Sequence, residues 1–265
     1  MKRGREGMGI ITLLTDFGQH DGYVGAMKGV ILSINPDATL IDITHDISPQ
    51  QISQGGFILS QAVPCFPKGT IHLAVVDPGV GSASRRPVVV ETTRHLFVGP
   101  DNGIFGQVLA GEQIRRVIDL TNREYHRSEV SPTFHGRDIF APVAAHLSMG
   151  CEVGLLGEKV DEIKRGSLVI PCHSGDVMTG VILHIDRFGN LITNVPSRYL
   201  TSGKVTITAG GAVITRFVKT YGDAKEGEIV VLIGSSGLME IAKRDGSAAC
   251  ELGLVIGAEI RVKGG

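Results

Sequence analysis

The stretch Ile10-Ile11-Thr12-Leu13-Leu14-Thr15-Asp16-Phe17-Gly18 decides the expected fold of the first half of the chain. Its first six residues are aliphatic or β-branched, which is typical of a buried strand, and an aspartate and a glycine end the run. Residues 23–34 then carry apolar side chains at helical spacing, and Asp21 precedes them as a candidate N-cap. A strand followed directly by a helix is the repeating unit of an α/β sheet.

The same alternation continues to about residue 150. It predicts further strands at residues 39–43, 71–76, 88–91, 95–98 and 116–120. It also predicts helices at residues 49–63 and 139–149. We therefore expect an α/β N-terminal domain with a mixed, largely parallel sheet over residues 8–165.

The character of the sequence changes near Gly166. Helical periodicity almost vanishes, and short runs rich in Val, Ile and Thr alternate with glycines. These runs predict strands at residues 177–185, 204–207, 212–218, 229–233 and 258–262. We expect a small all-β barrel as the C-terminal domain over residues 176–265, mostly antiparallel, with the boundary within residues 164–175.

Composition excludes several classes of protein. The chain has 265 residues, of which 42% are hydrophobic, and can bury a sizeable core, so a disordered chain is excluded. Lys+Arg 26 against Asp+Glu 27 leaves a formal net charge of -1, and no run of like charges stands out. A nucleic-acid partner is therefore not expected.

The cysteines and the N-terminus bear on the compartment. The cysteines are Cys65, Cys151, Cys172 and Cys250. They form no C-x-x-C pair, which argues against a zinc knuckle or a disulfide framework. The apolar stretch after the basic N-terminus, residues 10–14, is too short for a signal peptide or a membrane span. We expect a soluble, cytoplasmic protein with no membrane partner.

Three apolar runs each end in an aspartate with a glycine close behind it. They are followed by the turns at residues 15–18, 76–79 and 99–103. Asp, Pro and Gly are ordinary turn residues, and any one of these turns is explained by local structure alone. Three of them together favour a ligand site, because open α/β sheets bind ligands beyond the carboxyl ends of their strands.

The second of these turns, residues 77–82, lacks the spacing and the lysine of a P-loop. Arg85 and Arg86 follow it and are candidates to hold a carboxylate, or else are solvated loop charges. His135 lies just before a predicted helix, where it is either a site residue or an ordinary surface histidine. The histidines form no H-x-H or H-E-x-x-H pattern, so no metal site is supported.

The C-terminal domain carries two further clusters. Residues 185–194 place Asp186, Arg187, Asn190 and Asn194 around a glycine between two β-like runs, which is also what a hairpin turn uses. The small-residue loops at 234–237 and 246–249 leave room for a ligand close to the backbone.

Taken together, the chain resembles the S-adenosylmethionine (SAM) hydrolase family, also called SAM hydroxide adenosyltransferases, which are related to SAM-dependent fluorinase and chlorinase. The resemblance covers residues 10–262 and rests on motifs in order: T-D-F-G at 15–18, D-P-G-V-G at 77–81, V-G-P-D-N-G at 98–103, F-H-G-R-D at 134–138, D-R-F-G-N-L-x-T-N at 186–194, and the G-S-x-G-x-x-E-I-A and G-S-A-A runs near the end. It implies hydrolysis of SAM to adenosine and methionine without a metal or other cofactor. It also implies a homotrimer whose active sites lie between subunits.

The resemblance assigns roles to individual residues. It implies a catalytic triad of Asp77, Arg85 and His135, although the chain is one residue longer before the arginines, which leaves Arg86 as an alternative to Arg85. Asp16 resembles the carboxylate that receives the ribose hydroxyls.

The substrate-binding residues of the C-terminal domain follow in the same way. Asn190 resembles the carboxamide that reads the adenine, and Asp186 and Ser235 resemble groups that hold the methionine portion. The backbone near Ala248 lies by the base in this family.

The implied chemistry is displacement of a neutral thioether from ribose C5′ by water. We expect His135 to orient and polarise that water, with Asp77 and Arg85 ordering the charges around it. The halogenating relatives have a tyrosine where this chain has Asp77, and a carboxylate 4 Å from a halide costs about 4 kcal/mol at an effective dielectric near 20. Hydrolysis is thus favoured over halogenation.

Two hypotheses from other functional classes stay open. A metal-dependent phosphohydrolase also uses several aspartates at strand ends. A non-catalytic nucleoside-binding protein would use Asp16, Asp186 and Asn190 but would have no need of Asp77, Arg85 and His135.

Overall fold

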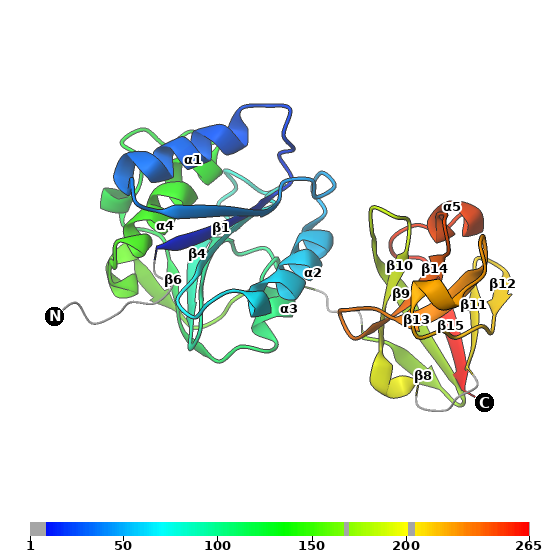
Figure 1. Cartoon of the computed structure of the whole chain (residues 1–265). Coiled ribbons are helices and arrows are strands. Elements are labelled where there is room, and N and C mark those ends of the chain that lie inside the picture. Colours follow the sequence, from blue (N-terminus) through cyan, green and yellow to red (C-terminus); the bar gives the residue numbers. More distant parts are fainter. Residues whose placement is uncertain (1–8, 167–169, 201–204, 265) are drawn as a thin grey trace. The chain divides into compact units, whose positions relative to one another are not determined.

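The computed structural model describes residues 9–166, 170–200 and 205–264. Its contacts divide the chain into two compact units, Met1–Leu168 and Val169–Gly265 (Figure 1). The boundary expected within residues 164–175 includes residues 167–169, which lie outside the described residues, as do the expected domain ends at residues 8 and 265.

The first unit is built on one seven-stranded sheet. Its order is β2-β1-β3-β5-β4-β6-β7, with strands β1 (Ile10–Thr15), β2 (Thr39–Thr44), β3 (Ile71–Val75), β4 (Pro87–Thr92), β5 (Leu96–Pro100), β6 (Ile114–Asp119) and β7 (Glu158–Val160). Strands β2, β1, β3 and β5 are parallel, whereas β4, β6 and β7 pair antiparallel. The predicted α/β class with a mixed sheet is confirmed.

Helices cover both faces of this sheet. The main helices are α1 (Tyr23–Ile34), α2 (Ile52–Ala62), α3 (Gly106–Leu109) and α4 (Ala141–Ser148), and short turns are η1 (Val63–Cys65), η2 (Arg123–Tyr125), η3 (Gly136–Phe140) and η4 (Val153–Leu156). Helices α1 and α4 pack on one another, and so do α2 and α3. The connections from β1 to β2 and from β2 to β3 run through α1 and α2 (Figure 1).

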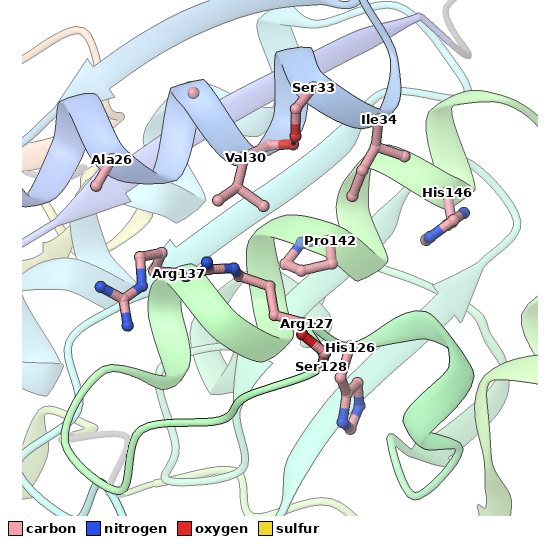
Figure 2. A pocket seen from close by; sticks show the side chains of 11 residues that line it. Ala26, Val30, Ser33, Ile34, His126, Arg127, Ser128, Arg137, Pro142 and His146 are labelled. Carbon is pink, nitrogen blue, oxygen red and sulfur yellow. Dashed lines mark hydrogen bonds between the residues drawn. The ribbon is translucent and has the colours of Figure 1, made fainter.

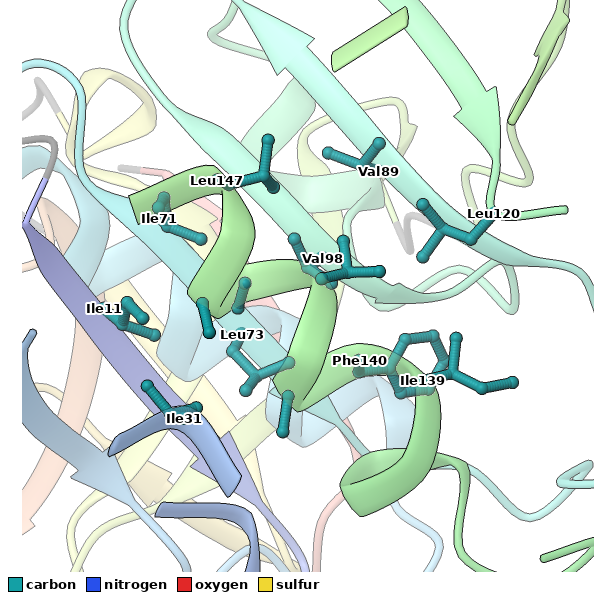
Figure 3. Packing of buried hydrophobic residues seen from close by; sticks show 14 of the residues in the cluster. Ile11, Ile31, Ile71, Leu73, Val89, Val98, Leu120, Ile139, Phe140 and Leu147 are labelled. Carbon is teal, nitrogen blue, oxygen red and sulfur yellow. The ribbon is translucent and has the colours of Figure 1, made fainter. Parts of the chain in front are cut away.

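Alternation along the strands sorts the core into two layers. Ile11 and Leu13 of β1 join Ile31 of α1 in one buried cluster, which also contains Phe140 (Figure 3). Leu14 joins the cluster on the other face. Because successive side chains of a strand point to opposite faces, one apolar run supplies both layers, as expected of a strand covered on both sides.

Two helix starts differ from the sequence expectations. Helix α1 spans the predicted residues, but its N-cap is Gly22 and no side chain caps it, so the expectation for Asp21 was wrong. Asp21 stands one residue too early to reach the first free amides. The helix expected from residue 139 begins instead with the π-helical turn η3, which carries the chain from His135 into α4.

The second unit is an antiparallel sheet nearly closed into a barrel, as predicted. Its order is β12-β11-β15-β9-β10-β14-β13, with β8 paired to β9. The strands are β8 (Cys172–Ser174), β9 (Val177–Ile185), β10 (Leu191–Pro196), β11 (Val205–Ala209), β12 (Ala212–Ile214), β13 (Ile229–Ile233), β14 (Leu238–Lys243) and β15 (Glu259–Gly264). Short helices are η5 (Ser197–Tyr199), η6 (Tyr221–Asp223) and α5 (Ala248–Leu252). Residue 204, the first of one predicted strand, lies outside the described residues.

Two buried histidines of the first unit make it sensitive to acid. His72 and His95 are 0% and 2% exposed, and their ring centroids are 5.0 Å apart. Burial and, secondarily, the charge of His95 lower the pKa of His72 from 6.5 to about 3. Burial also lowers the pKa of His95. Both rings therefore stay neutral near pH 7 in the folded protein.

We expect the protein to lose stability as the pH falls below 6.5. Between pH 6.5 and about 3 the unfolded chain binds a proton at His72 that the folded chain does not, so the free energy of unfolding falls on acidification. For His72 alone the loss at pH 5 relative to pH 7.5 is about 2 kcal/mol. Urea unfolding at the two pH values measures it.

A matched pair of variants isolates this contribution. His72→Leu should remove the His72 part of the pH dependence. His20→Gln should leave it unchanged, because the His20 side chain is fully exposed. An identical pH dependence in the parent protein and in His72→Leu would contradict the prediction.

Candidate active site

The carboxyl ends of the parallel strands bring two of the aspartate turns together. Asp16 follows β1 and Asp77 follows β3, and both residues line a cavity of about 420 Å³ together with Tyr23 and Gln50, although the Asp77 side chain is only 5% exposed and both its oxygens are buried. Asp101, in the third turn, is buried elsewhere and does not line it. The sheet edge expected from the sequence is thus the edge that carries the cavity.

Behind this cavity, Asp77, Arg85 and His135 form one cluster. Arg85 Nη2 lies 2.9 Å from Asp77 Oδ2 and 2.6 Å from His135 Nδ1. Arg85 is 6% exposed, and its Nε and Nη1 atoms are buried without a hydrogen-bond partner among the described residues. The structure therefore brings together the three residues predicted as a triad, with the guanidinium in the middle.

A glycine allows the two loops of this cluster to meet. Gly81 has a φ of +78°, and a Cβ atom there would lie 2.5 Å from the carbonyl oxygen of Pro132. The residue at this position must therefore lack a side chain if the loop after Asp77 is to pack against the segment that precedes His135. This contact holds Arg85 and His135 within bonding distance.

The hydrogen-bond partners of Arg85 and Arg86 show which of the two arginines lies in the cluster with Asp77 and His135. Arg86 donates from Nη2 to Asp101 Oδ2 at 2.6 Å and from Nε to the same oxygen at 3.1 Å. It also donates to the carbonyl of Glu162. Arg86 is thus engaged with a different carboxylate, and Arg85 is the arginine beside Asp77 and His135.

The electrostatics of the cluster favour a basic carboxylate at the cavity. Burial raises the pKa of Asp77, while the charge of Arg85 and the N–H of Gly79 oppose this, and Asp16 adds to it. Burial and the charge of Arg85 lower the pKa of His135. Since a guanidinium only donates, His135 Nδ1 accepts the bond from Arg85, and a neutral ring then carries its proton on Nε2.

Backbone and aromatic contacts hold the Asp16 side of the cavity. Asp16 Oδ2 accepts a hydrogen bond from the backbone N–H of Gln50 at 2.8 Å. The ring centroids of Phe17 and Tyr23 lie 5.8 Å apart, and both rings contact Phe134. Gln50 and Tyr23 line the cavity although neither belongs to a sequence motif, because their positions depend on the loop conformation.

The second unit has a cavity of its own, of about 660 Å³, lined by Asp186, Phe188, Asn190 and Tyr221 among others. Asp186 Oδ1 accepts the backbone N–H groups of Phe188 and Asn190, each at 2.9 Å. Asp186 Oδ2 accepts from Asn190 Nδ2 at 2.9 Å. The segment from Asp186 to Asn190 therefore forms a hairpin turn and also lines the cavity, so the two interpretations made from the sequence are compatible.

The other predicted residues of this unit lie differently. The N–H of Ala249 donates to the carbonyl of Gly189 at 2.9 Å, so the backbone beside buried Ala248 adjoins the Asp186–Asn190 turn. A Cβ at Gly189 would lie 2.1 Å from Ser247 Oγ, which explains the glycine at this approach. Ser235 is exposed in the turn between β13 and β14 and is not among the lining residues of the cavity.

Tyr221, which lines this cavity, pairs with a residue outside the lining, and this pair was not expected from the sequence. Tyr221 donates its hydroxyl to Glu240 Oε1 at 2.5 Å. Glu240 is buried, which raises its pKa, although the bond from Tyr221 opposes the shift. Glu240 is the acidic residue of the G-S-x-G-x-x-E-I-A run, so its position in that motif was the available signal.

Another cavity of the first unit, of about 600 Å³, lies between α1, α4 and residues 126–128 (Figure 2). Arg127 and Arg137 line it, and both are ion-paired with the buried carboxylate of Asp138. None of the predicted site residues lines it. Among the residues that the structure describes, no group of three or more His, Cys, Asp and Glu side chains is placed to hold a metal ion.

The first unit thus places a buried carboxylate at the wall of a cavity, paired with a guanidinium that also contacts an imidazole. Groups of these kinds, with perturbed pKa values at the carboxyl edge of an α/β sheet, are typical of the active site of an enzyme. Within the described parts of the chain, every helix falls short of the length and hydropathy of a membrane span.

Comparison with known proteins places the chain more narrowly. Residues 11–157 match the SAM hydroxide adenosyltransferase N-terminal domain, and residues 180–261 match the C-terminal domain of the same name. The chain belongs to the SAM hydroxide adenosyltransferase family.

Individual relatives agree with this assignment. The (R)-S-adenosyl-L-methionine hydrolase of Salinispora tropica is 38% identical over 96% of this chain and 98% of its own. The protein of that name from Methanocaldococcus jannaschii is 40% identical over 88% of each chain. A fluorinase from an Actinoplanes species is more distant, at 27% identity over 96% of this chain and 97% of its own. The crystal structure of an uncharacterized conserved protein from Thermotoga maritima superposes with a TM-score of 0.90 at 36% identity, covering 96% of this chain and 99% of that one.

Proposed function

We propose that this chain hydrolyses S-adenosyl-L-methionine to adenosine and L-methionine, and that it acts on the (R) epimer at sulfur. The names of the relatives at 38% and 40% identity support the reaction and the epimer. The proposal rests on the cavity lined by Asp16 and Asp77. Asp77 is paired there with Arg85, which also contacts His135.

The reaction is a displacement at ribose C5′. The water oxygen forms a bond to C5′ while the bond from C5′ to sulfur breaks, and the electron pair of that bond stays on sulfur as a neutral thioether. One proton of the water must leave. Asp77 is the triad residue that lines the cavity, and burial raises its pKa, which makes it a better proton acceptor.

Arg85 and His135 support this carboxylate from behind. The guanidinium charge faces Asp77 Oδ2, and His135 accepts the second bond of the same Nη2 atom and so fixes its direction. Neither residue is among those lining the cavity. His135 is nonetheless only partly buried, so its orientation of the water stays a prediction, and we assign acceptance of the water's proton to Asp77. Alignment of water and carbon supplies much of the remaining rate enhancement.

The substrate-binding roles follow the family pattern. Asp16 receives the ribose hydroxyls beside Asp77. Asn190 reads the adenine, near the backbone of Ala248, and Asp186 and Ser235 hold the methionine portion. Residues 8–165 thus supply the triad and the ribose site, and residues 176–265 supply the base and methionine sites.

The assembly that we propose is a homotrimer with active sites between subunits, located in the cytoplasm. Its support is that the predicted residues divide between two cavities on separate units, one with Asp16 and Asp77 and the other with Asp186 and Asn190. Sedimentation equilibrium measures the subunit number.

Incubation of the purified protein with each epimer of SAM in ¹⁸O water tests the function. We expect adenosine from the (R) epimer with label at the 5′-hydroxyl, full turnover in chelator, and no halogenated nucleoside in chloride or fluoride buffer, because Asp77 repels the anion. Loss of turnover in chelator would instead indicate a metal-dependent hydrolase. Bound but intact SAM after hours would indicate a binding protein.

A further inference from the structure

We propose that His45 is a positioning residue for the reaction: a chain of side chains running from Lys28 and Asp42, which are partly exposed, through buried His45 to buried Thr15 holds the turn that presents Asp16. The proposal rests on the ribose-binding role assigned to Asp16. It concerns residues at the ends of β1 and β2 for which no role has been stated above.

The contacts form a continuous path. Lys28 Nζ donates to Asp42 Oδ2 at 2.6 Å, and Asp42 Oδ1 lies 3.0 Å from His45 Nε2. His45 Nδ1 lies 2.8 Å from Thr15 Oγ1, which accepts the backbone N–H of Phe17 at 3.2 Å. Thr15 and His45 are 0% and 1% exposed. Water is thus excluded from the inner half of the path.

The chemistry of the partners gives this path one direction. Burial alone would raise the pKa of Asp42, but the contacts with Lys28 and His45 lower it overall, so Asp42 is a carboxylate that only accepts. Asp42 Oδ1 lies 3.0 Å from His45 Nε2, where its negative charge favours a proton on that nitrogen although the two groups are not aligned as a hydrogen bond. With that proton on Nε2, His45 Nδ1 is the acceptor of the ring. Thr15 must then donate its hydroxyl proton to His45, and its oxygen is free to accept from Phe17.

This direction matters because Asp16 lies between Thr15 and Phe17, which are hydrogen-bonded to each other across it. The N–H of Phe17 is bound by Thr15, and the N–H of Gly18 donates to the carbonyl of His45 at 2.8 Å. The side chain and the backbone of one histidine therefore restrain the turn just after Asp16. The pairing of β1 with β2 shifts register between Leu13 and Leu14, so regular strand pairing does not determine the backbone geometry at the end of β1. The side-chain path restrains this geometry instead.

Three variants test the path. His45→Leu removes the acceptor of the Thr15 hydroxyl. His45→Asn keeps an acceptor oxygen near the position of Nδ1. In Asp42→Asn, the asparagine must turn its oxygen toward Lys28 and its NH2 group toward His45 Nε2. His45 Nδ1 then carries the proton and donates to Thr15, which is the reverse of the order in the parent protein. We expect kcat/KM to fall about tenfold in His45→Leu, mainly through KM because Asp16 binds the ribose before and during reaction. The loss should be smaller in His45→Asn and in Asp42→Asn.

His72→Leu is the matched control. His72 makes the same 2.8 Å bond from Nδ1 to a threonine of β1, Thr12, and is as buried as His45, but it lies away from the cavity. This control should lower the free energy of unfolding without changing KM. An equal rise of KM in both histidine variants would show a general structural effect and overturn the proposal.

Two further measurements separate this proposal from the proposed function. In an Asp16→Ala background, His45→Leu should cause no additional change in KM, since both act through one carboxylate. Amide hydrogen exchange should accelerate at Phe17 in His45→Leu, a readout that needs no substrate. If Asp16→Ala leaves KM unchanged, the assigned role of Asp16 fails. If Asp16→Ala raises KM but His45→Leu alters neither KM nor exchange at Phe17, the positioning path fails.

Discussion

Replacing Asp77 with asparagine is expected to lower kcat by about 10²–10⁴-fold, the range that a positioned general base contributes. The asparagine has nearly the same shape and can still accept a bond from Arg85, but it cannot take a proton from water. A neutral His135 cannot replace Asp77 as proton acceptor, because its Nδ1 accepts the bond from Arg85 and its Nε2 carries a proton. Single-turnover release of adenosine from (R)-SAM measures the loss.

Asp101→Asn is the matched control for this variant. Asp101 is 1% exposed and ion-paired with Arg86 at 2.6 Å, much as Asp77 is paired with Arg85, but it does not line the cavity. The control should lose stability and keep its kcat. Turnover by Asp77→Asn at the rate of the parent protein would exclude proton acceptance by Asp77.

Much of the fold could be predicted because buried positions recur at a regular spacing in the sequence. The β1 run and the helix over residues 23–34 were predicted with the observed bounds, since each has an unbroken period and clear ends. Strand β14 was not predicted as a strand, and β10 was predicted only as the second β-like run of a candidate hairpin. Each adjoins a glycine-bearing turn and is interrupted by polar residues, Asn194 and Glu240, which the barrel buries and satisfies. Only tertiary pairing explains those positions.

The site was predictable where motifs lie at strand ends and unpredictable where loops fold back. Asp16 and Asp77 meet because parallel strands place their carboxyl ends at one edge, a rule that needs no coordinates. The roles of Arg85 and Arg86 could not be separated in sequence, because adjacent side chains reach different partners only once the loop is folded. Gln50 and His45 contribute through backbone groups and a buried ring, for which the sequence offers no motif.

Arg85→Met is expected to lower the free energy of unfolding by about 3–5 kcal/mol and to reduce turnover as well. The Arg85 and Asp77 side chains are each 5% exposed, so removing the guanidinium leaves a largely buried carboxylate without its counter-charge. Burial already raises the pKa of Asp77, and the loss of Arg85 raises it further, which favours the protonated acid that cannot accept a proton from water.

The double variant Asp77→Asn/Arg85→Met tests this reasoning. Because it buries no unpaired charge, it should be more stable than Arg85→Met alone while remaining as inactive as Asp77→Asn. Urea unfolding and single-turnover kinetics on the same preparations give both quantities. If the two single losses of stability simply add in the double variant, Asp77 and Arg85 are not coupled as an ion pair. The guanidinium would then act on catalysis through His135 rather than through the carboxylate.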